Sequence, residues 1–369
     1  MSDNVHYLYS PRPQQIAQIV RVPFHHHRTE RLWGANKLSA RRFVVEAANF
    51  GRQADFIRTL RDAGAEIILD TNVAELSVPA RFAGSVKSAP WARDSEMLDA
   101  DDMVVGTNRS VIESIARFAV ENQIDAILAP THYLGDNRCD WLSIDLKAAE
   151  GLRVALDREG GAAIALDYPL ILDMRQFRDP DMRARILQGL ASLPEGHIWL
   201  RVSGFGSDAT GVAMSKYIDA TSRLHCLARP IIADHVGGLA CQAVCAFGAA
   251  SGFAQGVDRK QRFQARSWLK PPQSVGGGAT RKLFLQDFDR SIPVEALRKM
   301  FDASRSARSL FGCADSTCCG DIETMLRNPA AHYSLQLSRS IDSLAAVPES
   351  MRTDQFLEKS VVAKMLKAQ

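Results

Sequence analysis

The sequence predicts an α/β protein, a (β/α)8 TIM-like barrel with a basic insertion and a C-terminal helical extension. Short β-branched runs recur along the chain, each followed by a polar or glycine-bearing turn and a stretch of helical periodicity. This alternation is typical of parallel strands joined by crossover helices. An open nucleotide-binding sheet is disfavoured, because no Gly-x-Gly-x-x-Gly turn follows the first run.

Eight strands are expected in chain order, since each short aliphatic run fits a strand buried between an interior and a layer of helices. The first seven span residues 42–47, 66–72, 125–130, 163–168, 198–203, 230–235 and 251–256. Helical periods follow the first and sixth of them. The eighth strand is either 282–286 or 309–313, and the sequence leaves this choice open.

The strands divide the chain into four regions. These are an N-terminal extension (1–40), the barrel (41–258), a basic insertion or lid (259–308), and a Cys/His-bearing segment with C-terminal helices (309–369). A further long excursion, 73–107, follows the second expected strand. Such insertions are expected to build a lid or substrate wall, because barrel active sites lie at the carboxyl ends of the strands.

Composition and charge exclude several classes of protein. The chain has 369 residues, 46% of them hydrophobic and 24% charged, with a formal net charge of +3. This is an ordinary globular composition, not that of a disordered tail. We find no apolar stretch of about 18 residues to cross a membrane and no apolar signal-peptide core at the N-terminus. A cytoplasmic protein is expected, whose seven cysteines serve as thiols or metal ligands rather than in disulfides.

Polar side chains gather at the ends of the expected strands. They are Glu46, Asp70, Asn72, His132, Asp167, Arg201, Ser203, Asp234, His235 and Gln255. Any one of them can be a helix cap or turn residue, but together they predict one polar barrel mouth. The predicted catalytic residues are Asp70, Asp167, Asp234 and His235. His132 and Arg201 are predicted to bind substrate.

Two other features of the barrel bear on its chemistry. A catalytic metal is disfavoured, because the first expected strand ends in Glu46-Ala-Ala-Asn49 without a His-x-His pair. Gly237 and Gly238 follow a strand and open a helix, so their amides suit an oxyanion or phosphate. A tight turn needs glycine there regardless of any ligand, and the sequence does not separate the two explanations.

A group of potential metal ligands lies beyond the expected barrel. Cys313, Cys318 and Cys319 are followed by His332. Three thiolates and one imidazole are the ligand set of a structural Zn²⁺ site, which makes the C-terminal extension a zinc-bearing one. The alternative is three buried or incidental thiols, because adjacent cysteines do not have the usual Cys-x2-Cys spacing.

The segment from Arg259 to Gln286 contains no acidic residue. Its cations begin with Arg259 and Lys260 and are interleaved with Phe263, Trp268 and Phe284. Clustered cations and aromatic rings hold phosphates and stack on bases. This segment, 259–286, is therefore the predicted contact with RNA or DNA, with a solvated loop as the alternative.

The order of these parts resembles the tRNA-guanine transglycosylase superfamily. Residues 65–72, Gly237-Gly238-Leu-Ala240 and the run 248–257 are similar to strands of that family, and the Cys/His segment resembles its zinc subdomain. The resemblance implies a barrel that exchanges a base in nucleic acid. Where the family carries its nucleophilic aspartate, this chain reads Phe253-Ala-Gln-Gly256, so Asp258 or one of the strand-end aspartates would have to replace it.

Three functions follow from the sequence. The first is an enzyme related to the transglycosylases that acts on a nucleobase or nucleoside in nucleic acid. The second is a non-catalytic nucleic-acid-binding subunit that keeps the barrel as a scaffold and works with a catalytic partner protein. The third is a barrel lyase or hydrolase for a small phosphorylated metabolite.

Overall fold

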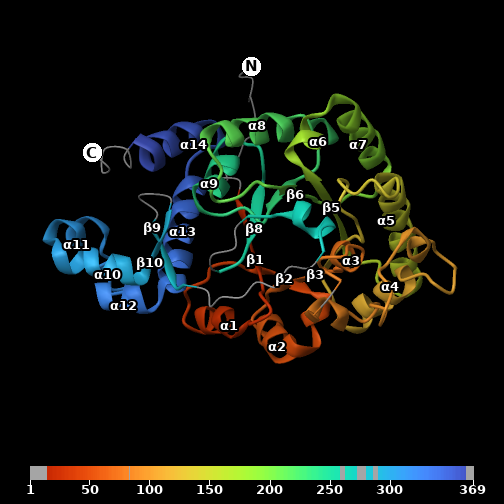
Figure 1. Cartoon of the computed structure of the whole chain (residues 1–369), viewed down its shortest axis with the longest axis horizontal. Helices are drawn as coiled ribbons and strands as arrows, with labels where there is room; N and C mark the ends of the chain where they lie inside the picture. The colour runs from red at the N-terminus through yellow and green to blue at the C-terminus, as the bar shows by residue number, and fades with distance from the viewer. Residues whose placement is uncertain (1–14, 83, 258–261, 272–279, 286–289, 363–369) are drawn as a thin grey trace, which may run out of the picture.

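Eight parallel strands close into a barrel, as predicted, in a computed structural model that describes residues 15–82, 84–257, 262–271, 280–285 and 290–362. Figure 1 shows the strands inside a ring of helices. The strands are β1 (Ala17–Arg21), β2 (Arg42–Glu46), β3 (Glu66–Asp70), β4 (Ala126–Leu128), β5 (Ala165–Asp173), β6 (Ile198–Ser203), β7 (Ile231–Asp234) and β8 (Gly252–Gln255).

The strand that closes the barrel is β1, from the segment expected to be an N-terminal extension. It pairs in parallel with β8, from Ala17 opposite Gly252 to Val20 opposite Gln255, and also with β2. Neither expected eighth strand belongs to the barrel. The first is β9 (Lys282–Leu285), antiparallel to β10 (Arg290–Pro293), and the second overlaps the end of α11 (Arg305–Phe311).

The short polar sequence of β1 explains why it was missed. Its run, Ala-Gln-Ile-Val-Arg, has only two branched aliphatic residues between polar ones. The side-chain oxygen of Gln18 accepts a hydrogen bond from the Ser338 hydroxyl at 3.0 Å, so a C-terminal helix satisfies the outer face of the strand. Arg21 is buried at the end of the strand by ionic contacts. A pattern of aliphatic residues in the sequence predicts neither the Gln18 contact nor the Arg21 contacts.

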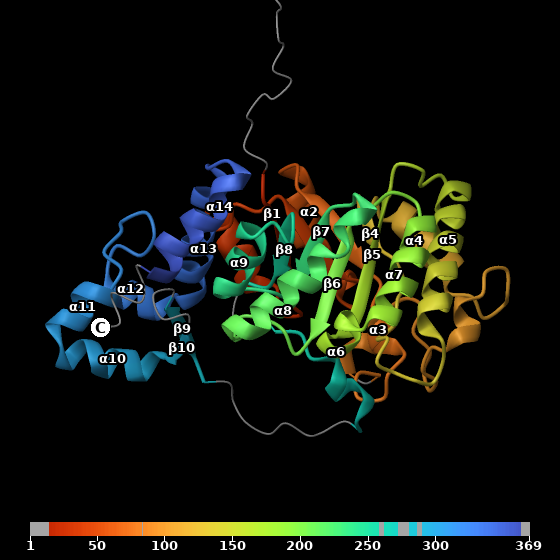
Figure 2. The same cartoon turned by 90° about the horizontal axis from the view of Figure 1, so that it is seen from above.

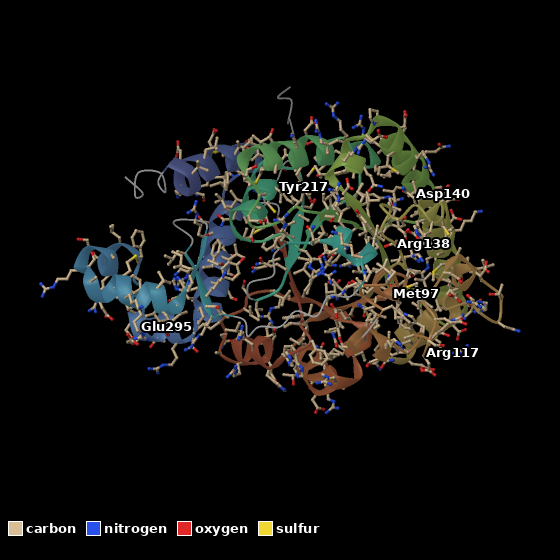
Figure 3. The ribbon with its side chains drawn as sticks, viewed as in Figure 1. Met97, Arg117, Arg138, Asp140, Tyr217 and Glu295 are labelled. Carbon is tan, nitrogen blue, oxygen red and sulfur yellow. The ribbon has the colours of Figure 1, made fainter. Side chains whose placement is uncertain are left out.

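Most helices lie between successive strands or follow the barrel. They are α1 (His27–Gly34), α2 (Ala54–Asp62), α3 (Val73–Leu76), α4 (Ile112–Glu121), α5 (Trp141–Arg158), α6 (Met174–Arg178), α7 (Pro180–Ser192), α8 (Gly211–Ser222) and α9 (Gly238–Ala246). Side chains fill the space between the layers (Figure 3), among them Tyr217 of α8, whose ring stacks on Phe205 with centroids 4.1 Å apart. Among the described residues, no helix has the length and apolarity needed to cross a bilayer.

The interior of the barrel has an apolar layer below a polar one. The apolar layer is a buried cluster that includes Ile19, Val44, Ile68, Trp199 and Ile232. Because strand side chains alternate between faces, the residue two positions further along points the same way. Those residues are Arg21, Glu46, Asp70, Arg201 and Asp234. The alternation therefore places a ring of charged groups at the carboxyl ends of five strands.

The segment after the barrel forms a C-terminal subdomain beside it. Its elements are the β9–β10 hairpin, α10 (Val294–Ala303), α11, α12 (Ile322–Arg327), α13 (Pro329–Ala345) and α14 (Glu349–Phe356). A separate buried cluster, which includes Leu283, Leu297, Phe301 and Met325, forms its core. Figure 2 shows α13 and α14 against the barrel, with α10 to α12 further out.

A substitution where β1 pairs with β8 tests whether these two strands close the barrel. A Cβ atom on Gly252 would overlap the carbonyl oxygen of Ala17. We expect Gly252→Ala to lower the free energy of unfolding by about 1–3 kcal/mol, as overpacking does in other cores, when measured by urea denaturation. Gly211→Ala is the matched control, because a Cβ there meets nothing within 4 Å. Equal stability of the two variants would contradict the closure.

Candidate active site at the barrel mouth

A buried network of two arginines and two aspartates occupies the centre of the barrel mouth. Arg21 donates from Nε and Nη2 to the Asp234 carboxylate at 2.6 and 2.7 Å, and from Nη1 to Asp70 at 2.9 Å. Arg201 donates to the same two carboxylates, at 2.6 Å to Asp234 and 2.7 Å to Asp70. All four residues are buried, and their charges balance. We call these residues the Arg/Asp network.

The network keeps both aspartates ionised. Burial acts in the opposite direction, but Arg21 and Arg201 hold the pKa of Asp234 well below its usual range. The same two guanidinium groups lower the pKa of Asp70. Every oxygen of Asp234 accepts at least one short guanidinium hydrogen bond. Asp234 is therefore not placed to attack a substrate without breaking the network. In Asp70 both arginines donate to Oδ2, while Oδ1 accepts a hydrogen bond from the Asn72 amide at 3.3 Å.

Two glutamates beside the network are held closer to neutrality. Burial, Glu75 and Asp70 together raise the pKa of Glu46 to about 7. Glu46 also accepts a hydrogen bond from the Asn49 amide at 2.7 Å. Burial and Asp70 raise the pKa of Glu75, whose Oε2 atom is buried and has no hydrogen-bond partner among the described residues. The pair can hold and transfer a proton.

The predicted site residues divide into those the network includes and those it does not. Asp70, Asp234 and Arg201 come together as expected. Asp167 does not join them, because β5 continues to Asp173 and Asp167 lies low in the barrel. There its carboxylate accepts hydrogen bonds from Trp199 at 2.8 Å and from the His197 amide at 2.8 Å.

The two histidines also differ in position. His235 follows β7 with a left-handed φ of 59° and lies beside Phe263, with ring centroids 5.3 Å apart. Burial and the nearby Arg21 lower its pKa to about 3, so its imidazole is neutral at physiological pH. His132 lies instead against α5. Its Nδ1 is 2.6 Å from Asp145, and its ring stacks on Trp141 with centroids 3.7 Å apart.

The glycine turn is bound to the C-terminal subdomain. The Gly238 amide donates to the Tyr333 hydroxyl at 3.2 Å, and that hydroxyl donates to Gln255 at 2.9 Å. Gly238 has φ of 62°, which only glycine adopts readily, so the tight turn accounts for this glycine. Gly237 precedes it as the N-cap of α9. Arg259, Lys260 and Asp258 lie outside the described residues.

The described part of the basic insertion covers the mouth. The Phe263 carbonyl accepts a hydrogen bond from the Gly204 amide at 2.9 Å, and the Trp268 carbonyl accepts one from Ala80 at 3.0 Å. Arg266 pairs with Asp173, the last residue of β5, at 3.0 Å. Phe263 and Trp268 pack in a buried cluster with residues that include Tyr133. We call residues 262–269 the lid, because these contacts hold the segment across the mouth.

Two residues of the candidate site, Arg21 and Glu75, were not predicted from the sequence. Arg21 lay in the segment assigned to the N-terminal extension, although its position two residues after buried Ile19 is the signal that could have revealed it. Glu75 gave no signal, because it lies on the short helix α3 within the 73–107 excursion. Only the packing of that excursion against the barrel brings Glu75 to the network.

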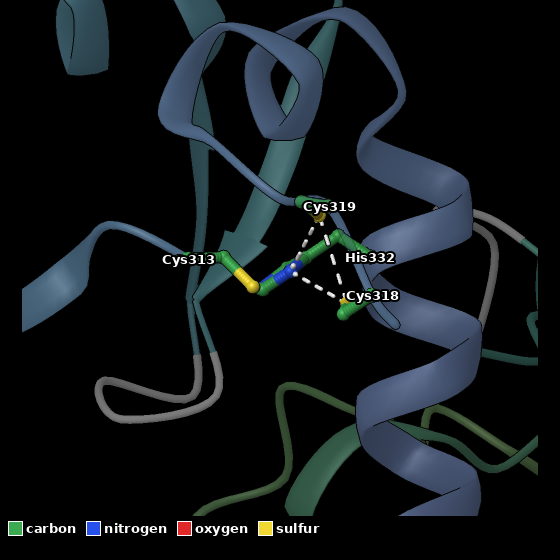
Figure 4. Close-up of side chains that lie close together, drawn as sticks. All are labelled: Cys313, Cys318, Cys319 and His332. Atoms are coloured by element: carbon green, nitrogen blue, oxygen red, sulfur yellow. Dashed lines mark hydrogen bonds between the residues drawn. The ribbon is translucent and has the colours of Figure 1, made fainter. Parts of the chain in front are cut away.

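A second candidate site lies in the C-terminal subdomain (Figure 4). The Sγ atoms of Cys318 and Cys319 are 3.6 Å apart and lie 3.5 and 3.4 Å from Nδ1 of His332. Cys313 completes the group, whose four ligand atoms all lie within 4.8 Å of one another. A tetrahedral Zn²⁺ with ordinary bond lengths would separate two sulfurs by about 3.8 Å, and sulfur from nitrogen by about 3.5 Å. The four residues fit a metal ion.

The backbone explains how adjacent cysteines reach one point. The Asp315 carbonyl accepts hydrogen bonds from the amides of Cys318, Cys319 and Gly320, at 3.0, 2.9 and 2.7 Å. Gly320 leaves this tight turn with a left-handed φ of 78°. The turn directs both sulfurs toward His332. The adjacent positions of the two cysteines in the sequence did not by themselves predict this arrangement.

Comparisons with known proteins do not identify a function for this chain. No protein-family model and no curated protein matches the chain, so the transglycosylase resemblance gains no support beyond the barrel itself. One similar solved structure is an enolase from the Sargasso Sea environmental genome, with 9% identity, TM-score 0.37, and coverage of 67% of this chain and 55% of that one. The chain thus spans about half the length of that enolase.

Two further solved structures are similar at the same level. One is the GH26 domain of an endo-β-mannanase/endo-β-glucanase from Prevotella bryantii, with 13% identity, TM-score 0.45, and coverage of 69% and 88%. The other is a putative fructose-1,6-bisphosphate aldolase from Coccidioides immitis, with 9% identity, TM-score 0.40, and coverage of 89% and 90%. At these scores the likenesses carry no argument about chemistry.

The raised pKa of Glu46 predicts a pH-dependent stability. The pKa is about 7 in the folded chain and 4.5 ordinarily, so the folded state binds more protons than the unfolded state between these values. Its contribution is complete below about pH 4.5 and is lost as the pH rises through 7. In the wild type, the free energy of unfolding should fall by about 3 kcal/mol from this group as the pH rises. Glu46→Gln should not show this fall when urea unfolding is measured between about pH 5 and 8. The control Glu121→Gln, at an exposed position, should keep the wild-type dependence of the free energy of unfolding on pH. If Glu46→Gln also keeps it, the pKa of Glu46 is not raised in the folded protein.

Proposed function

We propose that this chain is a barrel hydrolase or lyase that works by general acid–base chemistry on an uncharged ring, such as the base or sugar of a nucleoside. One observation carries the proposal. Glu46, at the carboxyl end of β2, and Glu75, on the short helix α3 that follows β3, are two carboxyl groups with raised pKa on the side of the barrel that the lid covers. Pairs of carboxyl groups in unlike environments divide the roles of acid and base in many enzymes.

The roles follow from the protonation of the pair. One glutamate, protonated near neutral pH, donates its proton to the leaving atom of the substrate, and the other accepts a proton from water or from the ring. We assign contact with the substrate to Oε2 of Glu75, which has no hydrogen-bond partner among the described residues. Asp70 is a positioning residue, because its negative charge raises the pKa of both glutamates. The lid excludes bulk water from the reaction.

Charge favours an uncharged ring over a phosphate at this point. Arg21 and Arg201 are already neutralised by Asp70 and Asp234, so no cation of the network is free to bind a phosphate. The glutamate that acts as the base would repel a phosphate when it is ionised. A small phosphorylated metabolite, the third function inferred from the sequence, therefore fits the mouth less well than a base or sugar.

The network also argues against covalent base exchange and against a purely structural barrel. Exchange requires an aspartate nucleophile, yet among the described residues Asp234 has both oxygens and Asp70 has one oxygen bound by guanidinium groups, and Gln255 stands at the end of β8. Asp258 lies outside the described residues. A scaffold without catalysis has no need of two glutamates kept near neutrality, because burying such groups costs stability. We therefore favour an active hydrolase or lyase over the non-catalytic subunit.

We further propose that Cys313, Cys318, Cys319 and His332 hold a structural Zn²⁺. The sulfur and nitrogen separations support it, and so does the donor set, which leaves no open position for catalysis. The ion would cross-link the segment between α11 and α12, which carries the three cysteines, to His332 on α13. None of the seven cysteines forms a disulfide. We also propose a cytoplasmic location, where thiols are kept reduced.

Activity tests the acid–base pair. We expect purified protein to release a free base or sugar from a panel of nucleosides, RNA and DNA, detected by chromatography with mass spectrometry. Glu75→Gln should lower the rate at least about a hundredfold, in line with the loss of one acid–base group, and should abolish one limb of the pH profile. Glu121→Gln is the control with the same chemical change on an exposed helix. Full activity in both Glu46→Gln and Glu75→Gln would refute the assignment.

Metal content tests the zinc site. Elemental analysis should find zinc bound in the wild type and absent after Cys313→Ser, together with a lower melting temperature. Exposed Cys226→Ser should keep both metal and stability. If the wild type contains no metal when expressed with added zinc, and Cys313→Ser melts normally, the four residues are an ordinary buried thiol cluster.

A further inference from the structure

A second group of potential metal ligands lies at the start of α1, and none of its residues belongs to the Arg/Asp network. His26, His27 and Glu30 each offer one ligand atom, and the three atoms all lie within 4.8 Å of one another. The expected first strand, 42–47, is not followed by a histidine pair. The first strand of the barrel is instead β1, and His26 and His27 lie in the segment that follows its end at Arg21. The group therefore follows the carboxyl end of the first barrel strand.

The first turn of α1 brings these side chains together. The Glu30 amide donates a hydrogen bond to the His26 carbonyl at 3.0 Å, which closes the turn. Residues three and four positions apart lie on the same face of a helix, so Glu30 is next to both histidines. Nδ1 of His27 lies 3.3 Å from Oε2 of Glu30, and the two imidazole rings have centroids 4.3 Å apart. Two imidazoles and one carboxylate are thus held within one turn of helix.

His26 is the fixed member of this group. Only 7% of the residue is exposed, and its ring stacks on Phe56 of α2 with centroids 5.9 Å apart. Its Nδ1 atom is buried and has no hydrogen-bond partner among the described residues. A buried polar nitrogen without a partner costs stability, so such an atom in a folded protein calls for an explanation. No described residue uses this nitrogen, and a ligand from outside the chain would explain why the imidazole is kept there.

The surroundings keep His26 in the form that binds metals. Burial lowers the pKa of His26, and so do the neighbouring His27 and Arg52, while Glu30 acts in the opposite direction. The His26 imidazole is therefore neutral at physiological pH, as a metal ligand must be. The side chains of His27 and Glu30 are 76% and 45% exposed, so an ion can reach them from solvent and they are free to adjust to it.

The ligand types favour a first-row transition metal over Mg²⁺ or Ca²⁺. Imidazole suits ions such as Zn²⁺ and Ni²⁺, whereas Mg²⁺ and Ca²⁺ prefer oxygen ligands. Two nitrogen or oxygen ligands of a tetrahedral Zn²⁺ lie about 3.4 Å apart, and the separation of 3.3 Å between His27 and Glu30 matches this value. The His26 ligand atom lies within 4.8 Å of both, and the two exposed side chains can move to close the remaining difference.

We propose that His26, His27 and Glu30 bind a divalent transition-metal ion, with Zn²⁺ as the expected ion. Three protein ligands leave a position open for water or a group of a ligand, unlike the closed set of three thiolates and one imidazole in the C-terminal subdomain. This second metal site goes beyond the proposed function, because it involves neither Glu46 nor Glu75.

Calorimetric titration of the full-length protein with Zn²⁺ tests the proposal. His27→Ala and, separately, Glu30→Gln should weaken binding at this site at least about tenfold, because even the loss of a group that only supports a ligand costs that much in metal affinity. His25→Ala is the matched control, since His25 is exposed and adjacent but does not belong to the group. It should keep the wild-type affinity. Urea unfolding of each variant confirms that it is folded.

Cys313→Ser separates this site from the zinc site proposed for the C-terminal subdomain. The binding event should persist in Cys313→Ser and should be weakened there by the added His27→Ala. Zinc binding that Cys313→Ser removes completely would overturn the proposal, as would binding that neither His27→Ala nor Glu30→Gln changes. Equal weakening by His25→Ala and His27→Ala would also overturn it, because any histidine of the run would then serve. So would Mg²⁺ binding with the same affinity as Zn²⁺.

Discussion

The pairing of Arg21 and Arg201 with Asp70 and Asp234 is the interaction on which the barrel mouth depends. Four charges are removed from water, and each is compensated only by the others. Loss of one partner from such a buried set typically costs about 3–5 kcal/mol, because the remaining charge is left unpaired. The network thereby fixes the relative positions of β1, β3, β6 and β7. Its Asp70 carboxylate also adds to the effect of burial, which raises the pKa of Glu46 and Glu75.

The C-terminal subdomain contacts the barrel mouth through Tyr333. Its hydroxyl accepts a hydrogen bond from the Gly238 amide and donates one to Gln255 at the end of β8. Tyr333 directly follows His332 of the Cys/His cluster on α13. The cluster therefore lies on the same helix that contacts the mouth.

The sequence predicted the fold class and part of the site, for reasons that particular residues make clear. Aliphatic alternation located seven strands, and the carboxyl-end rule located Asp70, Asp234 and Arg201. It misplaced Asp167, because the strand expected to end at residue 168 continues to Asp173. Arg21 was missed because β1 is stabilised by ionic contacts that leave no aliphatic pattern. Glu75 depends on how a loop packs, which no local periodicity records.

Closure by the first strand has a consequence for biosynthesis. Arg21 and Asp234 are separated by 213 residues in the chain, and β1 also needs β8 as its neighbour. A ribosome delivers the N-terminal strand first and its partner much later, and domains generally fold as units during synthesis. The partners of Arg21 therefore emerge in sequence, Asp70 of β3 first and Asp234 of β7 much later. The network is complete only once β7 has emerged, and the β1–β8 seam closes after that.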